Sequence, residues 1–190
     1  MFESFGISRV VGANNVFPVF AWKLDNSKII YDNEMLLKVT NIHFEESNFK
    51  QICNEAMSDP DVIKEKVLDL VETRGKLHNP YTNTGELLAG TVAKIGKNYV
   101  NAGNIKVGDK VLVLCSAAMI PLHIEEINDI DFSFGSFSVK GHGIIYGNCP
   151  VIKRISEIPI NLLMMAFEES SSIYHIYQIA KGKKEISHYR

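Results

Sequence analysis

The chain has 190 residues, of which 46% are hydrophobic and 22% charged, and its 20 basic and 22 acidic side chains leave a net charge of -2. A chain of this length buries about 70% of its unfolded surface, so its core needs no disulfide or metal. The basic residues are scattered, which argues against nucleic acid as a partner. No apolar run approaches the ~18 residues of a membrane span, so no membrane partner is expected either.

The three cysteines, Cys53, Cys115 and Cys149, are odd in number and lack a C-x-x-C spacing. This pattern argues against a disulfide framework and against a zinc knuckle, and Cys115 at the end of an apolar run is expected in the core. The N-terminus lacks the basic start and apolar stretch of a signal peptide. We therefore expect a reduced, cytoplasmic protein.

The first expected elements are a strand over residues 35–44 and two helices. The first helix follows a Ser47 cap, and the second starts at Ser58, has Pro60 in its first turn and stops at Gly75. Their apolar stripes at helical spacing are Phe49, Ile52, Cys53 and Ala56 in the first and Ile63, Val67, Leu70 and Val71 in the second. Both helices are expected to pack against a sheet.

Short segments rich in β-branched and aromatic residues follow, bounded by Gly, Asn, Asp or Pro. The expected strands cover residues 86–95, 109–115, 132–140, 143–146 and 151–155. Short strands at such intervals favour a small barrel or sandwich. A third helix is predicted from Pro159 to about Lys181, with Gly182 as its stop. The domain prediction is one domain over 1–157 and a linking helix and tail over 158–190.

Glycines mark the turns of the predicted barrel. Gly90, Gly96 and Gly108, followed by Asp109, form "GTVAKIG" and "VGDKVLVL". With the strand and two helices before them, these segments resemble the GroES-like catalytic domain of medium-chain dehydrogenases. The resemblance implies a mostly β fold with helices, a partly open β-barrel with flanking helices and a C-terminal linking helix. In zinc members of that superfamily a His and a Glu precede the first glycine, but here Glu86 and Leu87 stand there.

A zinc catalytic site needs three protein ligands, and no set of His, Cys and carboxylate at ligand spacing is found, so no metal is predicted. A closer resemblance covers residues 6 to 168. The segments "AWKLDNSKIIYDNEMLLKV", "RGKLHNPYTNTGELLAGTV" and "VGDKVLVLCSAAMIPLHIEEI" resemble the 3,5-diaminohexanoate dehydrogenase family, zinc-free enzymes of lysine fermentation. This resemblance implies oxidative deamination of L-erythro-3,5-diaminohexanoate at carbon 3 with NAD or NADP. The products would be 5-amino-3-oxohexanoate, ammonium and reduced cofactor.

A substrate with two ammonium groups and one carboxylate calls for carboxylates, a base and a cation. Arg74 or Lys76 is predicted to hold the substrate carboxylate, His78 to take the amine proton and Asn79 to orient water or the nitrogen. Glu86 is predicted to pair with an ammonium group. Each residue also has a structural interpretation: the two cations flank a helix end, His78 and Asn79 lie in a turn, and Glu86 suits a solvated strand. These alternatives stay open.

Two other side chains receive structural predictions. His43 alternates with Ile42 and Phe44 on a strand, and it is expected to face the surface without a catalytic role. Trp22 is the only tryptophan, and it is expected to be buried as a plug of the barrel rather than to stack on a substrate.

Hydride transfer requires a nicotinamide, which the superfamily holds on a Rossmann domain with a Gly-rich turn. No segment supplies that turn, and after Gly182 the chain reads "KKEISHYR". We expect an incomplete enzyme that is inactive alone, with a small diamino acid, a separate Rossmann-domain chain and a further copy of itself as possible partners. The alternatives are a non-catalytic binding or assembly module, and a fragment of a zinc-free quinone or enone reductase.

Overall fold

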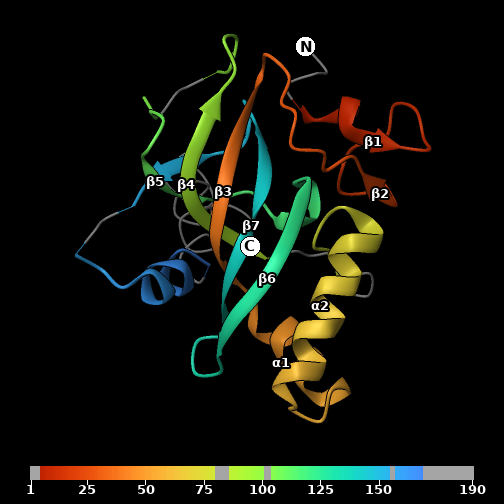
Figure 1. Cartoon of the computed structure of the whole chain (residues 1–190), viewed down its shortest axis with the longest axis vertical. Helices are drawn as coiled ribbons and strands as arrows, with labels where there is room; N and C mark the ends of the chain where they lie inside the picture. Colours follow the sequence, from red (N-terminus) through yellow and green to blue (C-terminus); the bar gives the residue numbers. More distant parts are fainter. Residues whose placement is uncertain (1–4, 80–85, 101–103, 155–156, 169–190) are drawn as a thin grey trace, which may run out of the picture.

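A computed structural model describes residues 5–79, 86–100, 104–154 and 157–168, and all structural statements concern these residues. The chain is mostly β with three helices (Figure 1). The main sheet has six strands in the order β6-β7-β3-β4-β5-β8, and every neighbouring pair is antiparallel. In chain order they are β3 (Glu34–His43), β4 (Leu87–Ile95), β5 (Lys110–Val113), β6 (Leu122–Asp131), β7 (Ser136–Tyr146) and β8 (Val151–Lys153).

The sheet is open, with β6 and β8 as its two edges in the described part of the chain. The expectation of a barrel is therefore corrected, because the described edge strands do not pair with each other. The likeness to a GroES-like domain stays a prediction. A separate two-stranded sheet, β1 (Val10–Val11) and β2 (Lys23–Leu24), lies beside the upper end of the main sheet in Figure 1.

Two differences from the predicted strands arise from the way in which β6 and β7 pair. Residues 132–140 and 143–146 were expected as two strands, but they contribute to one strand, β7, which continues through Gly141. A side chain at Gly141 would meet the carbonyl oxygen of His123 at 2.2 Å, so glycine permits close pairing here instead of ending the strand. Strand β6 was not predicted, because two bulges break its alternation. Its buried apolar residues are Leu122, Ile124, Ile127 and Ile130.

Helices α1 (Glu46–Glu55) and α2 (Pro60–Arg74) confirm the two predicted helices, with different caps. The Glu45 carboxylate, not Ser47, caps α1 by accepting from the backbone N–H groups of Ser47 and Asn48. Asp59 caps α2 in place of Ser58, and Gly75 ends it at a φ of 62°, as predicted. Residues 160–168 are helical, and the rest of the expected third helix lies outside the described residues.

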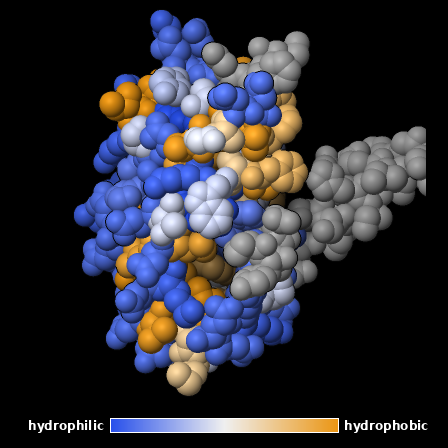
Figure 2. Space-filling model, turned by 90° about the vertical axis from the view of Figure 1, so that its right-hand side faces the viewer, coloured by the Kyte–Doolittle hydropathy of each residue, from blue (hydrophilic) through white to orange (hydrophobic). Residues whose placement is uncertain are grey.

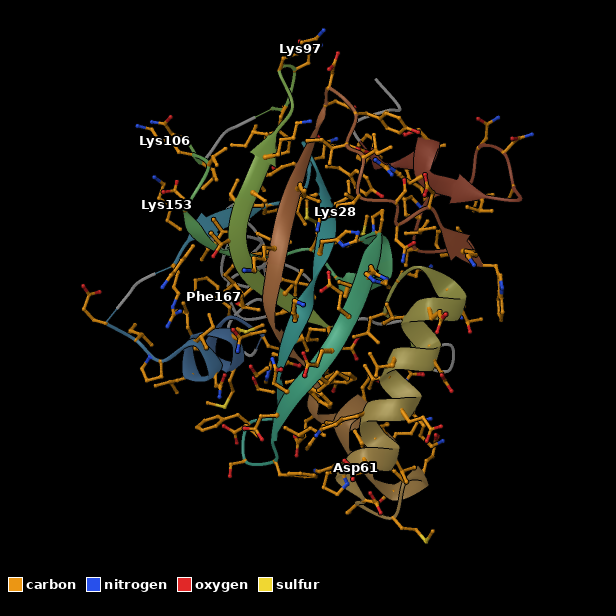
Figure 3. All side chains as sticks on the ribbon, viewed as in Figure 1. Lys28, Asp61, Lys97, Lys106, Lys153 and Phe167 are labelled. Carbon is orange, nitrogen blue, oxygen red and sulfur yellow. A yellow bond between two sulfur atoms is a disulfide. The ribbon has the colours of Figure 1, made fainter. Side chains whose placement is uncertain are left out.

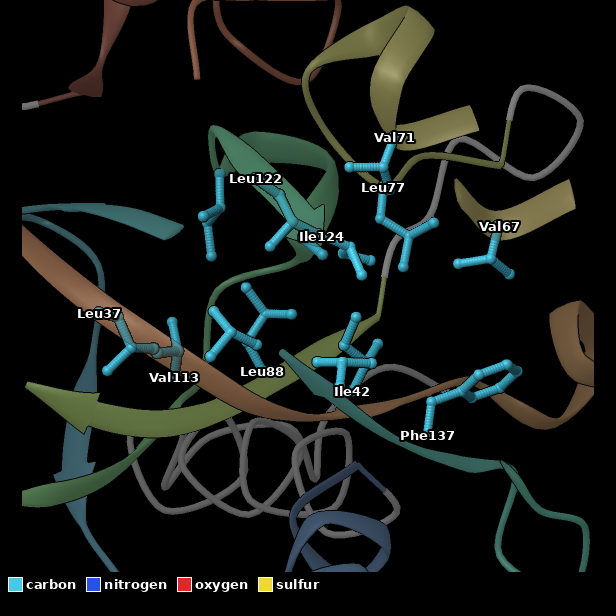
Figure 4. Close-up of a cluster of buried hydrophobic side chains, with 14 of the residues drawn as sticks. Leu37, Ile42, Val67, Val71, Leu77, Leu88, Val113, Leu122, Ile124 and Phe137 are labelled. Carbon is cyan, nitrogen blue, oxygen red and sulfur yellow. The ribbon is translucent and has the colours of Figure 1, made fainter. Parts of the chain in front are cut away.

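The main core lies between one face of the sheet and α2. Figure 4 shows side chains from α2 and from several strands converging there, among them Val67, Val71, Leu88 and Phe137. On β4 and β5 the alternate residues Ala89 and Leu112 point to the other face, where they contact the helix formed by residues 160–168. Phe167, labelled in Figure 3, packs against this second cluster. Apolar layers therefore cover both faces of the sheet.

A buried ion pair ties the N-terminal segment to the sheet. Arg9 donates from Nε and Nη2 to the two carboxylate oxygens of Glu34, at 2.9 and 2.6 Å, and both side chains are almost fully buried. Nη2 also donates to the carbonyl oxygen of Ile29 at 2.6 Å. The bidentate geometry makes this a strong, directional link between the segment before β1 and the start of β3.

Cys115 and Cys149 form a disulfide, with their Cα atoms 5.6 Å apart. This corrects the expectation that the cysteines are unpaired. The reason is strand register: Val113 on β5 is opposite Val151 on β8, so the residue two positions beyond the first meets the residue two positions before the second. Sequence spacing alone does not reveal this pairing.

The surface is largely hydrophilic on the face that carries α2 and the small sheet, with hydrophobic residues in separate patches (Figure 2). Charged side chains lie at the periphery; Lys97 and Asp61, for example, lie at opposite ends of the molecule in Figure 3. None of the described helices combines the length and the apolar character that crossing a membrane requires.

Candidate functional site

A cleft of about 240 Å³ lies between α1, α2 and the residue that precedes β4. Its wall combines apolar, amide and charged side chains. They are Phe44, Asn48, Gln51, Ile52, Glu55, Lys66, Leu70, Leu77, Asn79 and Glu86. Helix α1 supplies four of these residues at positions i, i+3, i+4 and i+7, which fall on one side of a helix. The cleft is thus built by one face of α1 against α2 and the start of β4.

Glu86 is the buried carboxyl group of the cleft, only 2% exposed. Its Oε1 accepts a hydrogen bond of 3.1 Å from Asn48 Nδ2, whereas Oε2 is buried and receives no hydrogen bond from the described residues. Burial raises the pKa of Glu86 to about 8; the Asn48 hydrogen bond opposes this rise, and the negative charges of Glu45 and Glu168 add to it. At pH 7, roughly nine in ten molecules therefore carry a neutral Glu86.

An amide network connects this carboxyl group to the opposite wall. Asn79 donates from Nδ2 to Asn48 Oδ1 at 2.8 Å and to Gln51 Oε1 at 2.9 Å. Asn48 in turn donates to Glu86. The backbone of Glu86 is held as well, because its carbonyl accepts from the Ala117 N–H at 2.8 Å. These contacts fix the direction in which the carboxyl group is presented.

The rim of the cleft carries an ion pair. Lys66 Nζ on α2 lies 3.4 Å from Glu55 Oε2 on α1, with side chains 41% and 47% exposed. An exposed pair of this kind contributes little to stability, so each partner can exchange the other for a charged ligand group. The cleft therefore offers two carboxyl groups and one ammonium group.

Arg74 and Lys76 do not line the cleft. Lys76 is fully buried and donates from Nζ to the carbonyl oxygens of Pro18 and Val19, at 2.7 and 3.0 Å. Burial, and then the nearby Arg74 charge, lower the pKa of Lys76 to about 8. Arg74 donates to the carbonyl oxygen of Trp22, and its guanidinium lies 4.1 Å from the centre of the Trp22 ring.

Trp22 itself is 68% exposed, so the expectation of a buried plug is wrong. Its ring lies over a cation instead of inside a barrel. Arg74 and Lys76 thus hold the segment that carries Trp22 through backbone carbonyls, a role with a clear structural basis. Their assignment as ligands of a substrate carboxylate stays a prediction.

His78 lies beside Arg74 and is also buried. Its Nδ1 is 3.2 Å from Arg74 Nη2, and because a guanidinium can only donate, Nδ1 must be the acceptor. A neutral His78 then carries its proton on Nε2. Among the predicted site residues, Asn79 and Glu86 meet in the cleft, whereas Arg74, Lys76 and His78 form a neighbouring buried group. The proposed role of His78 as a base stays a prediction.

His43 was expected to face the surface, but it is 4% exposed. Its Nε2 lies 2.5 Å from Glu168 Oε2, which joins the end of β3 to the helix of residues 160–168. The pairing between β3 and its neighbours shifts between Val39 and Asn41, so simple alternation from the start of the strand does not give the face of its last residues.

Sequence reasoning missed most of the cleft. The signal was available in α1, where Asn48, Gln51 and Glu55 form a polar stripe next to the apolar one. Lys66 gave no signal of its own, because only the packing of α1 against α2 brings it opposite Glu55. Within the described ranges, no group of three or more His, Cys, Asp and Glu side chains could hold a metal ion.

Comparison with known proteins places the chain. Residues 8–155 match the family described as the L-erythro-3,5-diaminohexanoate dehydrogenase N-terminal domain, and the chain belongs to this family. It is 33% identical over 183 residues to the L-erythro-3,5-diaminohexanoate dehydrogenase of Fusobacterium nucleatum, covering 96% of this chain and 53% of that enzyme. It is 34% identical over 164 residues to the enzyme of the same name from Acetoanaerobium sticklandii, covering 86% and 48%. The chain thus spans about half the length of these relatives.

Proposed function

We propose that this chain is the substrate-binding part of an oxidoreductase that deaminates L-erythro-3,5-diaminohexanoate to 5-amino-3-oxohexanoate with NAD or NADP. Membership of the dehydrogenase family supports the reaction class. The proposal includes a GroES-like architecture, a linking helix within 158–190, and a cytoplasmic place in lysine fermentation. The chain is proposed to be inactive alone.

The observation that carries the proposal is the charge pattern of the cleft. The diamino acid carries two ammonium groups and one carboxylate, and the cleft offers the complement: Glu86, Glu55 and Lys66. Its apolar wall of Phe44 and Leu77 suits the carbon chain between the charged groups. In this arrangement Lys66 binds the substrate carboxylate, and the two glutamates bind the ammonium groups.

The chemistry begins with an ammonium ion that must lose a proton before its nitrogen lone pair can assist the departure of hydride. The described residues do not fit a nicotinamide site, because their sheet is wholly antiparallel and has no Gly-rich turn between a parallel strand and a helix. The cofactor would be held elsewhere, on a Rossmann domain in the same or another chain. What the chain itself supplies is binding, orientation and a proton acceptor.

The test is a chimera that joins residues 1–190 to the part of the Fusobacterium nucleatum enzyme that this chain does not match. The chimera should reduce NAD or NADP when 3,5-diaminohexanoate is added. Binding of the diamino acid without reduction would favour a non-catalytic module. Reduction of a quinone or enone in its place would favour the reductase alternative.

A matched pair of lysines tests the binding mode in that chimera. Lys66→Ala should raise KM for the diamino acid by about tenfold to a hundredfold, because a charged hydrogen bond to the substrate is lost. Lys50→Ala removes an exposed lysine that pairs with Glu46 away from the cleft, and it should leave KM unchanged. Equal effects of the two substitutions would contradict the placement of the carboxylate.

A further inference from the structure

We infer that Glu86 is the proton-exchanging group of the cleft, so that the site takes up a primary ammonium compound and releases one proton for each molecule bound. This inference deepens the proposed function and depends on it for the identity of the ligand. It concerns the protonation state of Glu86 in the free chain and in the complex.

The two carboxyl oxygens of Glu86 differ, because one accepts a hydrogen bond and the other is buried without one among the described residues. Glu86 is one of the residues that line the cleft. Its Oε1 accepts from Asn48, and its Oε2 is buried and receives no hydrogen bond within the part of the chain that the structure describes. A buried polar atom without a partner is costly, and an ionised one far more so. In the free chain the carboxyl group reduces this cost by holding a proton. A ligand that enters the cleft and donates hydrogen bonds to Oε2 stabilises the ionised carboxylate, so the carboxyl group can release its proton.

The surrounding charges favour a cationic ligand. The charged groups near Glu86 are Glu45 before α1, Glu55 on α1, Lys66 on α2, and Glu168 on the helix of residues 160–168, which contacts His43 at the end of β3. Three of these are carboxylates, and Lys66 is already paired with Glu55 at the rim. An ammonium group beside Oε2 therefore finds no competing cation there among the described side chains.

The proton exchange is balanced: the protonated Glu86 carboxyl group and a ligand ammonium ion combine, and one proton leaves to solvent. In the complex, one ammonium proton is shared in the hydrogen bond between the Glu86 oxygen and the ligand nitrogen. No carbon bond changes in this step. The ligand nitrogen is then one short proton transfer away from the free amine, which is the form that can support loss of hydride.

Calorimetry of the full chain with 3,5-diaminohexanoate, in buffers that differ in ionisation enthalpy, counts the protons. At pH 7 about 0.9 proton should be released per ligand, and affinity should rise about 50-fold from pH 6 to pH 8, because the carboxyl group with a pKa of about 8 is emptied by binding. Glu86→Gln keeps an acceptor for Asn48 but should release no proton and bind with an affinity independent of pH. Glu55→Gln removes the other carboxylate that is proposed to bind an ammonium group, so it should weaken binding but keep the release of one proton per ligand bound.

Outcomes separate the inference from the proposed function. Binding without proton release, or the same release from Glu86→Gln, overturns the inference even if the chimera reduces nicotinamide. If the wild type releases a proton and Glu86→Gln does not, but the chimera is inactive, the inference stands and the proposed reaction is overturned. 3,5-Dihydroxyhexanoate, which lacks both ammonium groups, should cause no release; equal release with this compound would also overturn the inference, as would failure of the diamino acid to bind.

Discussion

Glu86 is a buried carboxyl group whose ionised form destabilises the folded chain. The Glu86 carboxyl group lies at the start of β4, where the backbone hydrogen bond from Ala117 and the side-chain bond from Asn48 hold it. Nothing in the described structure neutralises its charge, and Glu45 and Glu168 add negative potential. An apolar residue of similar size would fill this place at lower cost, and this is the reason for proposing that Glu86 binds a ligand.

The dependence of stability on pH tests this view without any ligand. Because the pKa of Glu86 in the folded chain, about 8, lies above its ordinary value of 4.5, its contribution to stability is complete below pH 4.5. That contribution is lost as the pH rises to 8, at about 1.4 kcal/mol per unit and about 4–5 kcal/mol in total. Glu86→Gln should match the wild type in free energy of unfolding near pH 4.5 and exceed it above pH 8.

Urea unfolding at a series of pH values measures this difference. The comparison uses the gap between wild type and variant, in which the titration of all other groups cancels. Glu55→Gln is the control, since its side chain is 47% exposed. A constant gap between wild type and Glu86→Gln across the pH range would show that Glu86 ionises in the folded chain as it does in water.

At the scale of elements, local pattern was enough to predict both helices and most strands. Apolar spacing predicted the buried face of α2, where Ile63, Val67 and Val71 are almost fully buried. It failed at β6, where two bulges turn the alternation of buried residues into spacings of two and three that resemble a helix more than a strand. A bulge depends on the partner strand, which the local sequence does not contain.

The candidate site was predicted only in part for a similar reason. Asn79 and Glu86 were singled out from their place near a motif, and both line the cleft. The same loop suggested Arg74 and Lys76, whose cationic ends instead contact backbone carbonyls of residues before β3. Charge is visible in a sequence, but the direction in which a long side chain folds depends on residues more than fifty positions away.

The Cys115–Cys149 disulfide is a link between elements that can be tested directly. It closes a loop with a sequence separation of 34 between β5 and the start of β8, and loop closure of this length contributes about 3–4 kcal/mol in the chain-entropy account. Unfolded, unreduced protein should show one reactive thiol, that of Cys53, and reduction should raise the count to three. Reduction should also lower the free energy of unfolding of the wild type.

Cys53→Ala is the matched control, because it removes the free thiol and keeps the disulfide. It should show no reactive thiol before reduction and the same loss of stability on reduction as the wild type. Three reactive thiols in protein purified without reductant would contradict the pairing, and would agree with the reduced protein that the cysteine spacing suggested.

At the scale of the whole molecule, the two faces of the sheet have different covers. Helix α2 covers the main core on one face, and the helix of residues 160–168 covers Ala89 and Leu112 on the other. Residues 160–168 therefore pack on the sheet formed by residues before 157, and the predicted division into 1–157 and 158–190 stays a prediction. The His43–Glu168 contact also joins β3 to this helix, so the described part of the helix belongs to the folded body.

Substitution of two neighbouring leucines on this helix tests whether its packing contributes to the stability of the whole chain. Leu163 is 4% exposed in the second cluster, whereas Leu162 is 43% exposed. Leu163→Ala should lower the free energy of unfolding by about 2–5 kcal/mol, because it leaves a cavity against the sheet. Leu162→Ala should change it by no more than about 0.5 kcal/mol. If residues 158–190 were only a tether, both variants would unfold at the same urea concentration as the wild type.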